Sequence, residues 1–126
     1  MPSFTATAPW LSCHNLQRTV AYFRDVLGFR GDWHWFWGDP PRHAGVSRDD
    51  VRILLVENPD RAARGAGSEY VIYVRDVTGA YEEHRASGAT IVEELGERPW
   101  GTHDYTVETP DGHLLVFTEA PDDLSR

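Results

Sequence analysis

The sequence predicts an α+β fold in which a strand–helix–three-strand unit occurs twice. Apolar residues recur at helical spacing over residues 16–27, directly before Gly28. A second segment with helical features ends at Gly88, which lies 60 residues after Gly28. The turn residues Pro110-Asp111-Gly112 follow Asp49 at a similar separation, 62 residues from Asp49 to Asp111. Two copies of one unit explain these matched distances.

The first unit is predicted to start with a short strand over residues 4–11. Asn15 can cap a helix, because its side chain can accept from the first free backbone N–H groups. The apolar side of that helix is formed by Leu16, Val20, Phe23 and Leu27. Strands are then expected near residues 29–37, 43–47 and 51–57, with a turn at 48–50 between the last two.

The second unit repeats this order. Residues 70–74 are rich in β-formers and predict a strand. Asp76 can cap a helix with Val77, Ala80 and Tyr81 on its apolar face. Strands are expected near residues 90–95, 103–108 and 113–119, and the Asp-Gly pair at 111–112 favours a tight hairpin between the last two.

We therefore expect one domain, residues 1–126, made of a first unit at 4–57, a second unit at 69–119 and a polar linker at 58–68. One helix can cover only one face of its sheet. The other faces must meet each other or a second chain, and a concave, partly apolar groove is the expected result.

Composition excludes several classes of function. The 126 residues carry 12 basic and 20 acidic side chains, a net charge of −8, and every basic residue is arginine. A lysine Schiff base and a phosphate-binding P-loop lysine are therefore excluded, and the charge argues against nucleic acid. No apolar run reaches the roughly 18 residues of a membrane span, and the N-terminus does not resemble a signal peptide. The single cysteine, Cys13, fits a reducing cytoplasm.

The most unusual segment is the run Trp33-His34-Trp35-Phe36-Trp37. In a strand, alternate side chains share a face, so Trp33, Trp35 and Trp37 would line one side. They could stack on a planar or cationic ligand, or they could form a core or a subunit interface. Trp100 is either a second wall of such a site or a loop residue that covers the core.

Candidate catalytic and metal-binding residues are scattered. The six histidines form no compact metal motif; His103 is the best single candidate ligand, and we expect His84 and His113 to be solvated. Cys13 and the adjacent His14 diverge in an extended chain and do not make a nucleophilic dyad. Glu69 begins a strand, where it could act as a base, a ligand or a counter-charge in the groove, or lie solvated at the strand end.

The order and spacing of several motifs resemble the vicinal oxygen chelate superfamily, which includes glyoxalase I, extradiol dioxygenases and bleomycin-resistance proteins. Residues 15–23 with 26–29 are similar to its first helix signature, and residues 109–115 are similar to its final hairpin. Within the superfamily, residues 45–51 and 96–101, followed by Asp104-Tyr105, resemble the bleomycin-resistance branch. A longer, tryptophan-rich segment before Gly45 departs from that branch.

This resemblance implies paired βαβββ modules that form a half-open β-barrel around a cavity, in a homodimer. Metal-dependent members place ligands at four strand positions, which correspond here to Ala8, about Leu54, Glu69 and Val116. Only Glu69 can ligate, and divalent ions need several oxygen or nitrogen ligands. We therefore expect no metal and no other cofactor.

The resulting hypothesis is a non-enzymatic, cytoplasmic protein that sequesters a planar, cationic antibiotic or natural product, as bleomycin-resistance proteins do. The predicted ligand-binding residues are Trp33, Trp35, Trp37, Trp100, Glu69, His103 and Asp104. One alternative is a lyase, isomerase or dioxygenase of the same superfamily, working without metal or with a displaced metal site built from residues such as His103, Glu69 and His43. Another is an interaction module whose tryptophan-rich strand is a dimer surface.

Overall fold

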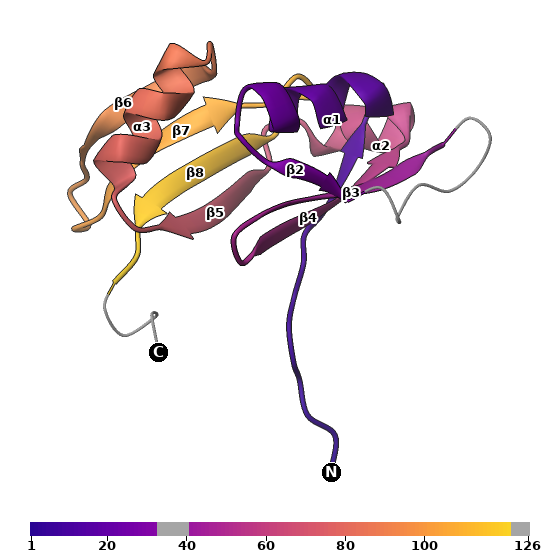
Figure 1. Ribbon diagram of the computed structural model, residues 1–126, viewed down its shortest axis with the longest axis horizontal. Helices are drawn as coiled ribbons and strands as arrows, with labels where there is room; N and C mark the ends of the chain where they lie inside the picture. Colours follow the sequence, from indigo (N-terminus) through magenta and orange to yellow (C-terminus); the bar gives the residue numbers. More distant parts are fainter. Residues whose placement is uncertain (33–40, 122–126) are drawn as a thin grey trace.

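The computed structural model describes residues 1–32 and 41–121, and its two halves have the same topology (Figure 1). The first half contains β1 (Trp10–Cys13), α1 (Leu16–Asp25), β2 (Arg30–Asp32), β3 (His43–Arg48) and β4 (Val51–Glu57). The second contains β5 (Glu69–Val74), α3 (Val77–Ala86), β6 (Thr90–Glu97), β7 (His103–Glu108) and β8 (Leu114–Glu119). A short helix, α2 (Pro59–Gly65), connects them. The predicted α+β fold of two βαβββ modules is confirmed.

Each module forms its own four-stranded sheet, with strand orders β1-β4-β3-β2 and β5-β8-β7-β6. The outer strand of each module, β1 or β5, runs parallel to the last strand, while the other pairs are antiparallel. Figure 1 shows the two sheets side by side, with α1 and α3 on the same side of the molecule. Within residues 1–32 and 41–121, the opposite faces of both sheets carry no helix, and the two sheets do not close into a full barrel.

Equivalent hydrogen bonds cap the N-termini of the two main helices, α1 and α3. The side chain of Asn15 accepts from Arg18 N at 3.0 Å, and that of Asp76 accepts from Gly79 N at 3.1 Å. The last residue of each sheet's final strand also reaches its helix: Glu57 accepts from Leu16 N at 2.9 Å and Glu119 from Val77 N at 3.1 Å. These acceptors satisfy N–H groups that have no partner inside the helix.

The core lies between the helices and the sheet faces below them. The stripe predicted for α1 is buried there, with Phe23 fully covered. In the second module Tyr105 stacks on Phe117 with ring centroids 5.2 Å apart, and both rings are buried. No helix in the described ranges combines the length and apolarity that a bilayer crossing requires.

The two modules are joined at one end by Asp111, in the β7–β8 turn. Its carboxylate is fully buried and accepts from His14 N at 2.7 Å and from the Thr19 hydroxyl at 2.6 Å, at the start of α1. The Arg18 guanidinium lies 3.7 Å from the same carboxylate. This turn of the second module thereby fixes the first helix of the first module.

Two element predictions are wrong. The first strand covers Trp10–Cys13 rather than 4–11, because Pro9 has no backbone N–H to continue a ladder and residues 1–8 are exposed. The linker at 58–68 contains α2, which Asn58 caps by accepting from Arg61 N at 3.1 Å. Pro59 suits the first helical position, and Ala62 is buried.

The expectation that His84 and His113 are solvated is also wrong, since both are buried. His84 Nδ1 lies 2.7 Å from the Tyr105 hydroxyl and Nε2 lies 3.1 Å from the carbonyl oxygen of Leu27. His113 Nε2 lies 2.7 Å from the carbonyl oxygen of Ser12. Both rings therefore connect the second module to the first. Burial lowers the pKa of His84 below its ordinary value, so we treat this ring as neutral.

Candidate functional site

A groove of about 390 Å³ lies on the helix-free face of the β5-β8-β7-β6 sheet. Strand alternation explains its lining. Ile72, Tyr105 and Phe117 are buried in the core, so their neighbours in sequence point to the opposite face. The groove is lined by Glu69, Val71, Tyr73, Glu93, Arg98, Trp100, Thr102, Asp104, Thr106, Val116 and Thr118.

Strand register arranges the floor of the groove in rows. Thr118 of β8 pairs with Tyr73 on one side and Asp104 on the other. The next row consists of Val71, Val116 and Thr106. One end of the floor is therefore polar and aromatic, while the middle is largely aliphatic. A ligand with a flat apolar body and polar substituents fits this division.

Arg98 holds the loop that forms one wall. Its guanidinium donates to Asp104 Oδ1 at 2.8 Å, to the Asp104 carbonyl oxygen at 2.9 Å and to the Glu94 carbonyl oxygen at 2.7 Å. Thr102 donates to the second carboxylate oxygen of Asp104 at 2.8 Å. The loop between Arg98 and Thr102 is thus fixed to the sheet, and Trp100 stands on it with 73% of its surface exposed.

The groove is acidic, but its carboxylates differ in their surroundings. Asp104 is buried and already engaged by Arg98 and Thr102. Glu93 Oε1 lies 3.1 Å from Arg98 Nη1. Glu69 is exposed and forms no ion pair within the described residues. Three carboxylates face one guanidinium here, so the groove carries a net negative charge, and Glu69 is its most exposed carboxylate.

One floor residue has unused hydrogen-bonding capacity. Thr118 is 4% exposed, and its hydroxyl oxygen has no hydrogen-bond partner among the described residues. A buried hydroxyl without a partner costs folding free energy. Thr118 lies between Tyr73 and Asp104 in the floor of the groove, so its unpaired hydroxyl lies beneath a ligand bound there.

The structure brings three of the predicted ligand-binding residues together, since Glu69, Trp100 and Asp104 line one groove. His103 precedes Asp104 on β7 and does not line it. The predicted tryptophans Trp33, Trp35 and Trp37 lie outside the described residues. Sequence reasoning missed Tyr73, Arg98 and Thr118. Tyr73 could have been predicted, because alternate residues of a strand share a face and Glu69 and Tyr73 lie four positions apart on β5. Nothing in the sequence indicated the contacts of Arg98.

The donor set of the described residues does not fit a metal centre. No group of three or more His, Cys, Asp or Glu side chains in residues 1–32 and 41–121 is arranged to hold an ion. The trio His103, Glu69 and His43 considered for a displaced site is therefore not brought together. At the groove itself, Glu69 lies near Val116, an aliphatic residue that cannot ligate.

Duplicated βαβββ modules with a groove on one sheet face define the architecture of this protein, and sequence comparison identifies its family. The profile of the Glyoxalase/Bleomycin resistance protein/Dioxygenase superfamily matches residues 5–117. The chain belongs to this superfamily. No curated protein matches its sequence.

Solved structures with this fold include antibiotic-binding proteins. The bleomycin-binding protein from bleomycin-producing Streptomyces verticillus, solved with copper(II)-bleomycin, is 25% identical with a TM-score of 0.79, covering 96% of this chain and 100% of its own. TioX from Micromonospora sp. ML1 is 26% identical with a TM-score of 0.71, covering 91% and 98%. The bleomycin resistance determinant encoded on transposon Tn5 is 18% identical with a TM-score of 0.76, covering 92% and 98%, and shows the shared fold alone.

Proposed function

We propose that the protein binds and sequesters a planar, cationic antibiotic or natural product without altering it. The observation that carries this proposal is the acidic groove with an exposed tryptophan on a fixed loop. Trp100 would stack on the flat part of the ligand, and Glu69 would face its positive charge. The likeness to a protein solved with copper(II)-bleomycin supports the same ligand class.

We further propose that the binding unit is a homodimer. Apolar side chains remain exposed on the helix-free faces, including Trp10 at 57%, Val71 at 56% and Tyr73 at 52%. Exposed apolar patches of this kind mark interaction surfaces. A second copy would cover them and close the groove from the open side. Sedimentation analysis should then give twice the chain mass of 14.3 kDa.

Titration calorimetry with metal-free and copper(II)-loaded bleomycin and a small panel of planar antibiotics tests the function. We expect micromolar or tighter binding of at least one cationic member, together with quenching of tryptophan fluorescence. Trp100→Ala should weaken binding by about tenfold, because one aromatic contact contributes roughly 1 kcal/mol beyond the area it buries. Trp100→Phe should retain most of the affinity but lose part of the quenching.

The charge prediction uses a matched pair of variants. Glu69→Gln should weaken binding of a cation, whereas Glu82→Gln, an exposed substitution on α3 outside the groove, should not. Ligand recovered intact after prolonged incubation would agree with sequestration. Turnover of the ligand, or equal binding by wild type and both Trp100→Ala and Glu69→Gln, would contradict the proposal.

A further inference from the structure

The two modules correspond along most of their length, and comparing them exposes a difference between their β3–β4 and β7–β8 turns. The helix caps Asn15 and Asp76 correspond and lie 61 residues apart, and the strand ends Glu57 and Glu119 correspond and lie 62 residues apart. A separation of 62 residues also relates Asp49, in the β3–β4 turn, to Asp111, in the β7–β8 turn. Each of these turns faces the helix of the other module.

At the Asp111 end this junction is closed, because Thr19, His14 and Arg18 surround the carboxylate. At the Asp49 end the positions corresponding to Thr19 and Arg18 are Ala80 and Gly79. Neither side chain can donate a hydrogen bond. Asp49 therefore lacks the side-chain donors that Thr19 and Arg18 supply to Asp111, and we call this end the open junction.

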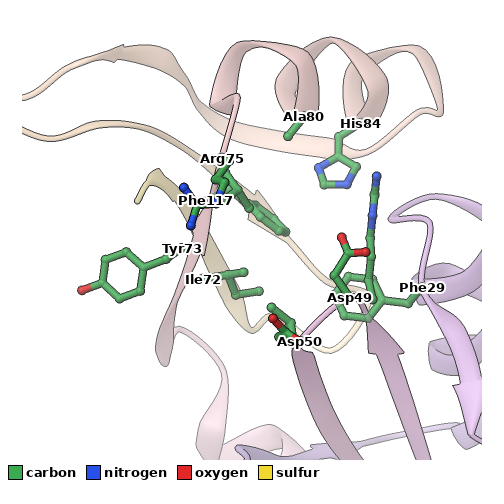
Figure 2. Close-up of a pocket in the computed structure, with 12 residues that line it drawn as sticks. Phe29, Asp49, Asp50, Ile72, Tyr73, Arg75, Ala80, His84 and Phe117 are labelled. Atoms are coloured by element: carbon green, nitrogen blue, oxygen red, sulfur yellow. The ribbon is translucent and has the colours of Figure 1, made fainter. Parts of the chain in front are cut away.

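A cavity of about 400 Å³ occupies the open junction. Its inner surface is apolar: Ile72 and Phe117 come from the second sheet and Phe29 from the first module. Figure 2 shows Ala80 and His84 on α3 above the cavity, with Asp49 and Asp50 on the far side from Arg75. It shares only Tyr73 with the ligand groove, and in this view the Tyr73 ring points away from the cavity.

The charges around the cavity are not balanced. Arg48 donates to Glu83, with Nη2 at 2.8 Å from Oε1, and to the carbonyl oxygen of Leu27 at 2.9 Å, so its charge is already paired. In the described part of the chain, Asp49, Asp50 and Arg75 form no salt bridge. Two carboxylates thus face one guanidinium, and the rim carries one net negative charge. Burial lowers the pKa of His84, which favours its neutral form, so His84 is not counted among these charges.

We propose that the open junction is a second binding site, distinct from the groove, for a small organic amine with an apolar body. The ammonium group takes the place of the missing donors beside Asp49 and Asp50. The apolar body lies against Ile72, Phe117 and Ala80. Occupying the site would add a contact between the two modules to the Arg48–Glu83 ion pair and the His84–Leu27 hydrogen bond that already join them at this end.

Titration with 2-phenylethylamine, followed by NMR of the backbone amides, tests the proposal. We expect saturable shifts centred on Ile72, Ala80 and Phe117, with a Kd of roughly millimolar order, as suits so small a ligand. The neutral analogue 2-phenylethanol should bind at least about fivefold more weakly, and the anion 3-phenylpropionate more weakly still, because the rim is negative.

Variants separate this site from the groove. Asp49→Asn and Asp50→Asn should each weaken amine binding severalfold, and asparagine tolerates the φ of 51° at position 49. Ala80→Val should weaken amine binding, because the larger side chain takes up part of the cavity beside Ile72 and Phe117. Glu69→Gln, in the groove, should leave it unchanged.

The proposal is overturned if the shifts map to the groove and not to the open junction, if the alcohol binds as well as the amine, or if no saturable shift appears. It is also overturned if Asp49→Asn and Asp50→Asn, both in exposed positions, bind the amine as wild type does. These results do not depend on the antibiotic titrations, so either proposal can fail alone.

Discussion

Replacing Asp111 with alanine should weaken the closed junction between the modules more than any surface substitution would. The wild-type carboxylate is fully buried and receives two short hydrogen bonds, from His14 N at 2.7 Å and from the Thr19 hydroxyl at 2.6 Å. Alanine removes both acceptors. The Thr19 hydroxyl, in a residue only 2% exposed, then stays buried without its acceptor.

The expected loss can be estimated from these contacts. A hydrogen bond to a charged group contributes about 1.5–3 kcal/mol to stability. The loss of both bonds is partly offset in the variant, because alanine avoids the cost of desolvating a buried carboxylate. We expect Asp111→Ala to lower the free energy of unfolding by about 3 kcal/mol, which corresponds to a fall in Tm of roughly 10 °C for a domain of this size. Thr19→Val should cost about 1–2 kcal/mol.

Urea unfolding followed by far-ultraviolet circular dichroism provides the assay. Because Thr19 and Asp111 share one contact, the double variant Thr19→Val/Asp111→Ala should lose less than the sum of the single variants, by about 1 kcal/mol. Glu82→Gln serves as an exposed control and should stay within about 0.5 kcal/mol of wild type. A loss below about 1 kcal/mol for Asp111→Ala, or strict additivity, would refute the reasoning.

Three further predictions follow from buried groups. Burial raises the pKa of the Cys13 thiol from 9.0 to about 12, so a thiol reagent at pH 8 should label native protein about a thousandfold more slowly than protein in urea. Burial lowers the pKa of His84, so the unfolded chain binds a proton that the folded chain does not, and the free energy of unfolding should fall as the pH drops below 6.5. His84→Phe should flatten that slope in denaturant titrations at pH 7 and pH 5. Thr118→Val should raise the free energy of unfolding by about 1 kcal/mol, because it removes a buried unpaired hydroxyl. The same substitution should weaken antibiotic binding. A loss of stability, or an unchanged affinity, would contradict a role of the Thr118 hydroxyl in ligand binding.

Most of the fold could be predicted because its signals are local and occur twice. The apolar stripe of α1 and the helix caps Asn15 and Asp76 are each signals within a single helix, and the structure confirms the stripe and the two caps. The loop prediction for residues 58–68 is wrong because it, too, rests on local composition. The glycines of this segment indicate a loop, yet Asn58-Pro59 starts a helix, and tertiary packing of Ala62 stabilises it.

The site was only partly predictable, since it depends on contacts that strand alternation alone does not specify. Alternation places Glu69 on the same face as Asp104, and both line the groove. It could not reveal that Asp104 is already engaged. Arg98 reaches Asp104 beside a segment of β6 where the register with β7 shifts between Glu93 and Gly96, and such irregularities leave no reliable mark in a single sequence.

The buried histidine at position 84 shows how the two modules came to differ. It corresponds to Phe23, 61 residues earlier, and both side chains lie buried under their helices. Phe23 only packs, whereas His84 also bonds to Tyr105 and to the carbonyl oxygen of Leu27 in the first module. Two pairs of corresponding positions therefore make the junctions unequal. Ala80 cannot donate a hydrogen bond as Thr19 does, which leaves one junction open. At that same junction His84 makes a polar contact to the first module that Phe23 does not make at the other. The topology on both sides is the same, so the open junction results from local differences, namely these side chains and the shorter β3–β4 turn, with residues 49–50 between the strands against residues 109–113.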